Sequence, residues 1–458
     1  MSLLQRYRRL LEEVCARVFP QRRTAQRAVE HALITPVLFG RRTLSRVIWA
    51  LGRHLQDWSA DYRLFSRRRW HSDGLFEPVL REFLDRYPRG PIALAVDDTG
   101  LHKTGAKIAT AHWQYDPLSP PFRANLAYGL RFLAAALLFP HYREGGRSAR
   151  AYPIRFQETP FVKKPGKRAT DQQRHLYLQE KKQRNLSVAT RELLGGIRRQ
   201  FDALGAADRR LLVSLDGSFC NQTLFRLPLD RIDLLARCRR DTQLAWPVPD
   251  QGQRRYSQQK FTPEQIRQDP TCPYEKFRVY FAGARRVVRC KVVTGVLWQR
   301  GARCRPLRLL VIGPRPYRPR GGGRRRYRDP AYLLTTDLHS PVGRLLQAYC
   351  DRWEIEVNHR DEKSLLGVGQ AQLRHPASVA RHPTFTVAAY SLLLLAALQC
   401  FGVTRHPAFP ALPRWRRSAG RASLLDILTL LRGELHETPI SRPERLPTPP
   451  NWLTSAFG

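Results

Sequence analysis

Acidic residues are scarce in this chain. Its 458 residues include 38 Asp and Glu against 79 Lys and Arg, which gives a formal net charge of +41. So large an excess of one sign repels itself unless an anionic partner neutralises it. The natural polyanion is nucleic acid, because each phosphate that a Lys or Arg binds releases counterions and adds affinity. The shortage of acids therefore predicts a nucleic-acid partner.

Paired cysteines are also missing. The chain has eight cysteines, all scattered, and none of them forms a Cys-x-x-Cys pair. This spacing argues against a zinc site and against a disulfide framework. The first nine residues are already charged and amphipathic, which is unlike a secretory signal. We expect a reduced, cytoplasmic protein associated with the nucleoid.

Long hydrophobic runs are rare. One stretch, 383–404, carries no charge and contains the run Leu392–Leu395. Polar residues interrupt it, among them Thr384, Tyr390 and Gln399. We therefore predict a buried core helix here, with no membrane partner, although the length would also allow a membrane span.

The amino-terminal part, residues 1–88, has the pattern of a short helical domain. One apolar stripe falls at i, i+3, i+4 and i+7 and consists of Leu44, Val47, Ile48 and Leu51. Arg42 and Arg46 flank this stripe, as expected of a helix that binds DNA in a groove. An ordinary surface helix with solvated arginines explains the pattern equally well.

Two short apolar runs further along each lead into aspartate. Ile92–Val96 is followed by Asp97 and Asp98, and Leu211–Leu215 is followed by Asp216. Such runs are typical of buried strands in an α/β protein, whose functional groups lie at the carboxyl ends of the strands. Either aspartate could instead simply start a turn.

The middle of the chain changes in texture twice. Residues 142–185 are polar and basic and resemble a long loop, whereas 240–306 contain several runs rich in β-branched and aromatic residues. The latter indicate a β-rich insertion, which is followed by a low-complexity basic loop at 314–328.

A third acidic candidate lies on a late segment, 341–366, that we predict to be one long helix. At 100° per residue, Tyr349, Arg352, Glu356 and Lys363 fall within about 60° of one another. Glu356 can then face a metal while its three neighbours face phosphates. A solvated helix face with an Arg352–Glu356 pair is the alternative.

Carboxylates from three distant segments can converge on divalent ions. Asp98, Asp216 and Glu356 would offer hard oxygen ligands suited to Mg²⁺, with Mn²⁺ able to substitute. Two such ions can activate a water or a 3′ hydroxyl and stabilise the leaving oxygen of an in-line phosphoryl displacement.

The late helix resembles the third motif of the IS4-type DDE transposases, including their IS701-like branch. That motif is Tyr, two residues, Arg, three residues, Glu, six residues and Lys, and every interval is matched from Tyr349 to Lys363. The family's first motif, an apolar strand running into Asp-Thr, is matched by Val96 to Thr99. Its second, a strand running into Asp and a small residue, is matched by Asp216 and Gly217.

The resemblance implies an RNase H-like catalytic core with a helical amino-terminal DNA-binding domain and a β-rich insertion. Asp98, Asp216 and Glu356 would be the metal ligands of the catalytic site, and Tyr349, Arg352 and Lys363 would contact transposon-end DNA. Asp97 and Glu354 are the alternatives. Asp98 is preferred because it directly precedes Thr99, and Glu356 because of the motif spacing. Glu354 lies about 200° from Glu356, so both cannot face the metals.

The expected divisions follow from this order. They are a DNA-binding domain at 1–88, core segments at 89–239 and 331–405 around an insertion at 240–330, and a helical segment at 406–458. Family members cut at terminal inverted repeats and join the ends to target DNA, usually as dimers. An RNase H-like nuclease without strand transfer and a domesticated, non-catalytic DNA-binding protein remain as alternatives.

Overall fold

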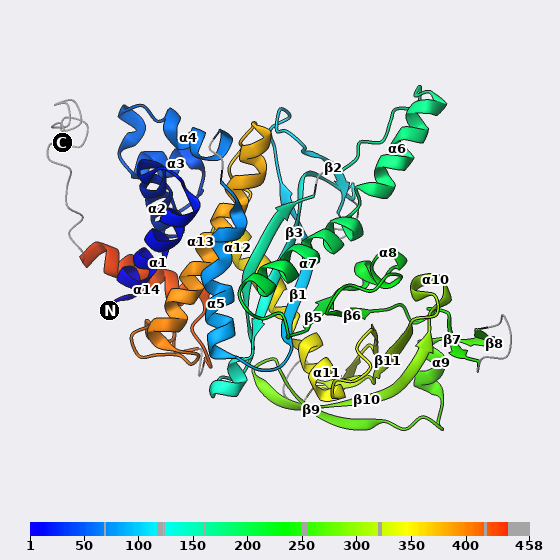
Figure 1. The fold of residues 1–458 in the computed structure, drawn as a ribbon. Coiled ribbons are helices and arrows are strands. Elements are labelled where there is room, and N and C mark those ends of the chain that lie inside the picture. The colour runs from blue at the N-terminus through cyan, green and yellow to red at the C-terminus, as the bar shows by residue number, and fades with distance from the viewer. Residues whose placement is uncertain are drawn as a thin grey trace.

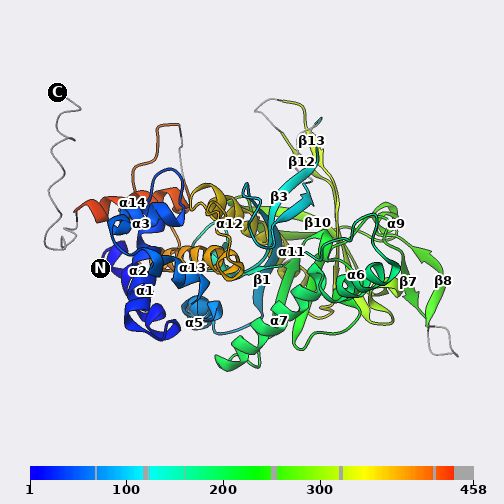
Figure 2. The ribbon, with the colours of Figure 1, turned by 90° about the horizontal axis from the view of Figure 1, so that it is seen from above.

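The computed structural model describes residues 1–437 apart from 68–69, 117–121, 123, 160, 249–254, 319–322 and 416–418. Its centre is a mixed sheet of twelve strands. Helices from both ends of the chain lie to one side of this sheet, and the late β-strands extend it on the other side (Figure 1). Seen from above, the helical part, the central strands and the extension follow one another across the molecule (Figure 2).

Five neighbouring strands form the core of the sheet, in the order β4-β3-β1-β5-β6. β1 pairs antiparallel with β3 and parallel with β5, and β5 pairs parallel with β6. This arrangement is compatible with the RNase H-like core that the resemblance implied. Their bounds are β1 Ile92–His102, β3 Leu126–Phe139, β4 Arg150–Glu158, β5 Leu211–Leu215 and β6 Ile232–Arg237, with the short β2 His112–Tyr115 beside β3.

The β-rich composition of 240–306 was predicted correctly, but these strands continue the central sheet. β14 pairs with both β6 and β11, and β11 pairs with β10. The strands within 240–306 are β7 Leu244–Pro247, β8 Tyr256–Phe261, β9 Glu275–Phe281 and β10 Ala284–Leu297. They are followed by β11 Pro306–Ile312 and by β14 Ala331–Thr335, which joins them to β6; we call the strands of 240–330 the extension. The short helices α9 Pro263–Gln268 and α10 Gln299–Ala302 lie between them in the chain.

The amino-terminal residues are helical, as predicted. Their helices pack on the late helices α13 and α14 within the same hydrophobic cluster as the sheet. The Tyr7 hydroxyl donates to the carbonyls of Ala32 and Ala389, which joins α1, α2 and α13. The helices are α1 Leu3–Val18, α2 Arg22–Val37, α3 Leu44–Ala50, α4 Ser59–Ser66, α5 Glu77–Arg86, α13 Pro376–Phe401 and α14 Leu424–Glu437. The expected helical segment at 406–458 is thus helical over α14, and its residues after 437 lie outside the described part.

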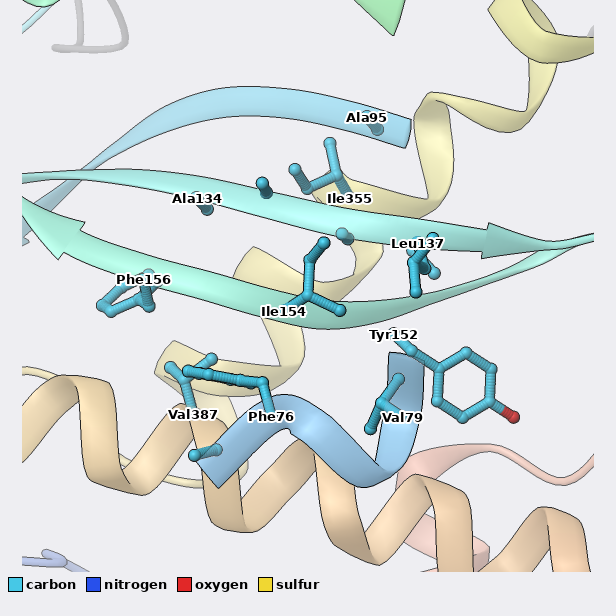
Figure 3. Packing of buried hydrophobic residues seen from close by; sticks show 14 of the residues in the cluster. Phe76, Val79, Ala95, Ala134, Leu137, Tyr152, Ile154, Phe156, Ile355 and Val387 are labelled. Carbon is cyan, nitrogen blue, oxygen red and sulfur yellow. The ribbon is translucent and has the colours of Figure 1, made fainter. Parts of the chain in front are cut away.

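Helix α13 is the buried core helix predicted from the charge-free stretch. It is long and apolar enough to cross a membrane, but 83% of its most apolar window is buried inside the protein. Figure 3 shows Val387 of α13 and Ile355 of α12 (Trp353–Ser364) among the apolar side chains packed around β3 and β4. Alanines such as Ala95 and Ala134 leave room for a helix to approach closely on this face.

Three local predictions were wrong. Residues 142–185 are not one long loop, because they include β4 and α6 (Asp171–Gln183), and α7 (Leu186–Ala203) follows directly. The basic segment 314–328 contains a small two-stranded sheet of β12 Arg315–Tyr317 and β13 Arg326–Arg328, with 319–322 outside the described residues. The predicted single helix at 341–366 is two helices, α11 Val342–Asp351 and α12 Trp353–Ser364.

Candidate active site

The first pair of aspartates lies inside a strand and not at its end. β1 continues to His102, and its pairing with β5 stops at Val96 opposite Leu215. Asp97 and Asp98 therefore occupy the part of β1 that is hydrogen-bonded to β3 alone. Asp216 follows β5 directly, just beyond the end of this pairing. The register thus brings the first and second acidic segments to neighbouring positions of the sheet.

Asp98 faces Asp216 and a basic side chain. Burial raises the pKa of Asp98; Arg131 and His359 oppose this shift, and the nearby Asp216 carboxylate adds to it. Arg131 projects from β3, and burial lowers the pKa of its guanidinium while Asp98 acts against that shift. Two carboxylates that repel each other in a half-buried place would be stabilised by a cation.

Asp97 faces the late helices. Its Oδ2 lies 3.6 Å from Nη1 of Arg352, and its Oδ1 accepts the backbone N–H of Asp98 at 2.9 Å. Burial raises the pKa of Asp97 to about 6, against the opposing effects of His359 and Arg352. Successive side chains on a strand point to opposite faces. Asp97 is accordingly the strand acid that contacts Arg352, and Asp98 is the one influenced by Arg131 and Asp216.

Arg352 stands at the joint between the two late helices. α11 ends at Asp351 and α12 begins at Trp353, so one helical wheel cannot run from Tyr349 to Lys363. The contact within the motif nevertheless forms, because Arg352 Nη2 lies 3.1 Å from Oε1 of Glu356. One guanidinium therefore bridges Asp97 on β1 and Glu356 on α12.

The two glutamates of α12 have different surroundings. Glu354 forms a 2.6 Å ion pair with Arg421, which lies in the segment just before α14. Glu356 has a side chain that is 34% exposed and is paired with Arg352 beside the aspartates. This difference favours Glu356 over Glu354 as the residue of the site.

The other two residues of the motif also lie near the carboxylates. Burial raises the pKa of Tyr349, with Arg237 and Arg352 lowering it and Asp216 raising it further. Burial lowers the pKa of Lys363, and Asp97 and Asp98 are among the acids that oppose the shift. Both side chains thus interact electrostatically with the strand acids Asp97, Asp98 and Asp216, which we call the acidic cluster.

The two arginines proposed for the amino-terminal domain are not part of this cluster. Arg42 is buried, its backbone N–H donates to Gln370 at 2.7 Å, and its guanidinium donates to the carbonyl of Gly40. Arg46 is exposed on α3, 5.9 Å from the ring centre of Trp49. Arg46 is therefore accessible to DNA, whereas Arg42 has a structural environment.

The three carboxylates are not gathered into a group that could hold a metal ion. Within the described residues, no three His, Cys, Asp or Glu side chains form such a cluster. The donors still fit a hard divalent cation in kind, because all are oxygen ligands and Asp98 and Asp216 repel each other. Arg352 supplies the positive charge next to Glu356.

Two further residues belong to this site, and sequence reasoning missed both. His359 lies three residues after Glu356 on α12 and influences both Asp97 and Asp98, so helical spacing could have revealed it. Arg131 comes from β3, and its approach to Asp98 depends on an antiparallel pairing across the sheet. The local sequence around Arg131 gives no sign of that pairing.

Two cavities flank the cluster. One of about 900 Å³ opens beside Asp216, and the arginines that line it are Arg237, Arg239, Arg240 and Arg267. Another of about 360 Å³ is lined by Tyr349, Arg352 and Trp353 together with strands of the extension. Their basic and aromatic linings suit phosphates and bases of a nucleic acid.

A comparison with known families gives one match, which covers more than half of the chain. Residues 16–278 match the family of DDE superfamily endonucleases, and the match includes Asp98 and Asp216 but stops before Glu356. The chain therefore belongs to the DDE superfamily endonucleases. Membership identifies a nuclease- or transposase-type enzyme that acts on DNA, in a family whose nucleases generally use divalent metal ions. No match was found among curated proteins.

Proposed function

We propose that the protein is a DNA transposase of an insertion sequence, of the IS4 type and its IS701-like branch. It would cut DNA at the terminal inverted repeats of its element and join those ends to target DNA. The observation that carries this proposal is the meeting of three acidic segments. β1 brings Asp97 and Asp98 next to Asp216, and Arg352 links β1 to Glu356.

Asp98, Asp216 and Glu356 would hold two Mg²⁺ ions, or Mn²⁺ in their place. Asp97 is the alternative to Asp98, because it lies on the face of β1 that shares Arg352 with Glu356. When bound, such ions supply a nucleophile at neutral pH and stabilise the leaving oxygen of an in-line displacement. For the third carboxylate to take part, Glu356 must exchange Arg352 for the cation. The freed guanidinium of Arg352 would then bind a DNA phosphate as a planar fork.

The remaining motif residues position DNA in this proposal. Lys363 supplies a point charge for a phosphate, and Tyr349 lines the cavity beside Arg352. Arg46 adds an exposed contact from the helices at 1–88. Arg42 has a structural role, because its backbone N–H donates to the side chain of Gln370. The protein would act in the cytoplasm, at the nucleoid, as a homodimer on double-stranded DNA. The catalytic core would consist of 89–239 and 331–405, with 240–330 inserted between them.

The decisive experiment uses a DNA fragment that carries the element's own ends, with Mg²⁺. Wild type should cut and join it, whereas Glu356→Gln, Asp98→Asn and Asp216→Asn should each lose roughly a hundredfold or more of both activities. Glu354→Gln is the matched control on the same helix and should stay near wild type, because Glu354 is paired with Arg421. DNA binding, measured separately, should survive in all four variants.

The same experiment separates the alternatives. Normal cutting and joining by Glu356→Gln would remove Glu356 from the site. A full loss in Asp97→Asn with activity retained in Asp98→Asn would move the metal ligand to Asp97. Cutting by wild type without joining would favour a nuclease, and DNA binding without either reaction would favour a domesticated binding protein.

A further inference from the structure

A projecting segment near the candidate site has no role in the proposed chemistry. It comprises residues 161–184, which we call the α6 arm, and contains the thirteen-residue helix α6. α6 has no buried residue, and Figure 1 shows it standing away from the strands at the upper right. The helix is thus almost free of packing contacts within the described chain.

Such a helix gains little stability from its own chain. An isolated helix shorter than about 12–15 residues is marginal in water, and most helices depend on packing of an apolar face. α6 does have a complete capping box between Thr170 and Gln173. This cap fixes where the helix begins but gives it no surface to pack against.

The arm is strongly basic. It contains eight basic residues and two acidic ones, Asp171 and Glu180. The basic residues, all exposed, are Lys163, Lys164, Lys167, Arg168, Arg174, Lys181, Lys182 and Arg184. The two acids are paired with Arg174 and Arg184. The other six basic side chains make no ion pair within the described residues and are available to an anion.

The apolar residues of α6 do not form a docking face for a protein. Leu176 and Leu178 are 56% and 54% exposed, and they lie two positions apart. At 100° per residue they point about 200° away from each other, so no single stripe exists. A mainly polar helix without an apolar stripe, set in a basic arm, suits a polyanion better than an apolar groove.

The arm leaves the sheet at the edge where the acidic cluster lies. β4 runs parallel to β1 and β5, because both β1 and β4 pair antiparallel with β3. The arm follows β4, so it starts on the same side as the carboxyl ends of the strands that carry Asp98 and Asp216. At its root, the ring of Phe161 stacks 3.8 Å below the guanidinium of Arg131, the basic neighbour of Asp98.

We propose that the α6 arm is a sequence-independent clamp for the phosphate backbone of duplex DNA that leads away from the carboxylate site. This inference rests on DNA being the substrate, as the proposed function states. The basic side chains of the α6 arm neutralise phosphates on the stretch of duplex beyond the reacting bond. Phe161 connects the arm to Arg131, so a bound duplex is held in register with the acidic cluster.

The test is the salt dependence of binding to a random-sequence duplex, measured without metal by fluorescence anisotropy. Full-length protein is compared with a fourfold variant, Lys163→Gln, Lys164→Gln, Lys167→Gln and Arg168→Gln. The slope of log affinity against log salt is negative, and each lost phosphate contact should lower its magnitude by about 0.9. We expect this magnitude to fall by two to four such steps, that is by roughly 2 to 4. The altered side chains are exposed, and the far-ultraviolet circular dichroism should be unchanged.

A matched variant controls for net charge. It carries Lys276→Gln, Arg278→Gln, Arg285→Gln and Arg286→Gln on the exposed part of β9 and β10, away from α6 in Figure 1. The magnitude of its slope should fall by less than one step. An equal fall in both variants, or an unchanged slope in the arm variant, would overturn the clamp. Failure of wild type to bind any duplex would instead overturn the proposed function.

Discussion

Arg352 contacts acids from two of the three acidic segments, Asp97 on β1 and Glu356 on α12. It is 9% exposed, and its Nε and Nη1 have no hydrogen-bond partner among the described residues. A buried guanidinium with unsatisfied donors is costly unless a further anion can reach it. Arg352 is paired only with Asp97 and Glu356 among the described residues, and in the proposed function a DNA phosphate would satisfy its remaining donors.

The neighbouring Asp351 gives a prediction about pH. Burial raises the pKa of Asp351 from its ordinary value of 3.8 to about 7, although Gln347 and Tyr142 donate hydrogen bonds to it. The folded state thus holds a proton that the unfolded state releases near pH 4. The stability from this proton is fully present below pH 4 and is lost as the pH rises through about 7.

The gain in stability of Asp351→Asn over wild type should therefore be larger at pH 8 than at pH 4. The shift corresponds to at most roughly 4 kcal/mol. Denaturant unfolding at the two pH values measures the difference. Asp171→Asn, which changes a fully exposed aspartate, is the control and should show no such dependence. A stabilisation of Asp351→Asn that is equal at both pH values would contradict the buried-proton explanation.

At the scale of elements, the segment between α12 and α13 ties three parts of the molecule together. Lys103 at the end of β1 donates to the carbonyls of Gly369 and Ala371 at 2.6 and 2.7 Å. The Gln370 side chain accepts the backbone N–H of Arg42 from the amino-terminal helices. The turn after α12 thus sets the distance between the Glu356 helix and β1.

Gly369 is the residue on which this turn depends. Its φ is +94°, and a Cβ there would meet Cβ of Leu101 on β1 at 3.1 Å. Gly369→Ala should destabilise the protein by roughly 1–3 kcal/mol, because it adds backbone strain and crowds β1. Gly433→Ala is the matched control, since Gly433 lies in an exposed turn of α14 with open space around it.

The control substitution should be neutral or stabilising by about 0.5–1 kcal/mol. Thermal unfolding measures both variants, and end cleavage measures the consequence for the site. Gly369→Ala should lower the cleavage rate more than the affinity for DNA, because it displaces α12 and leaves the basic surfaces intact. Equal stability of the two alanine variants would refute this role of the turn.

At the scale of the whole molecule, one sheet joins the core and the extension. The main hydrophobic cluster runs from Leu3 in α1 to Leu309 in β11 and Leu431 in α14. β14 lies between β6 and β11, so the extension cannot unfold by itself without exposing a strand edge of the core. We therefore expect residues 240–330 and the core to unfold as one cooperative unit.

Leu309→Ala tests this expectation. Leu309 is fully buried, and its truncation should cost about 2–5 kcal/mol. Amide hydrogen exchange should then accelerate in β11 and in the distant β5 by the same factor, whereas Leu425→Ala on the exposed side of α14 should change neither by much. Faster exchange confined to β10 and β11 would show that the extension is a separate unit.

The sequence predicted the parts of this protein that depend on local order. Apolar runs at 92–96 and 211–215 predicted β1 and β5, and the charge-free stretch predicted the core helix α13. The Arg352–Glu356 pair that the structure contains was the alternative interpretation of this segment, in which the two side chains pair at a spacing of four residues. The excess of basic residues agrees with the DNA substrate of the family.

Only the tertiary structure decided what depends on pairing between distant segments. The register of β1 against β3 and β5 placed Arg131 and Asp216 beside Asp98, and no local pattern encodes a register. The break at Arg352 separated α11 from α12, so that one guanidinium could reach both β1 and Glu356. The extension became part of the central sheet because β14 pairs on both sides, and strand pairing over such distances is fixed only when the whole core packs.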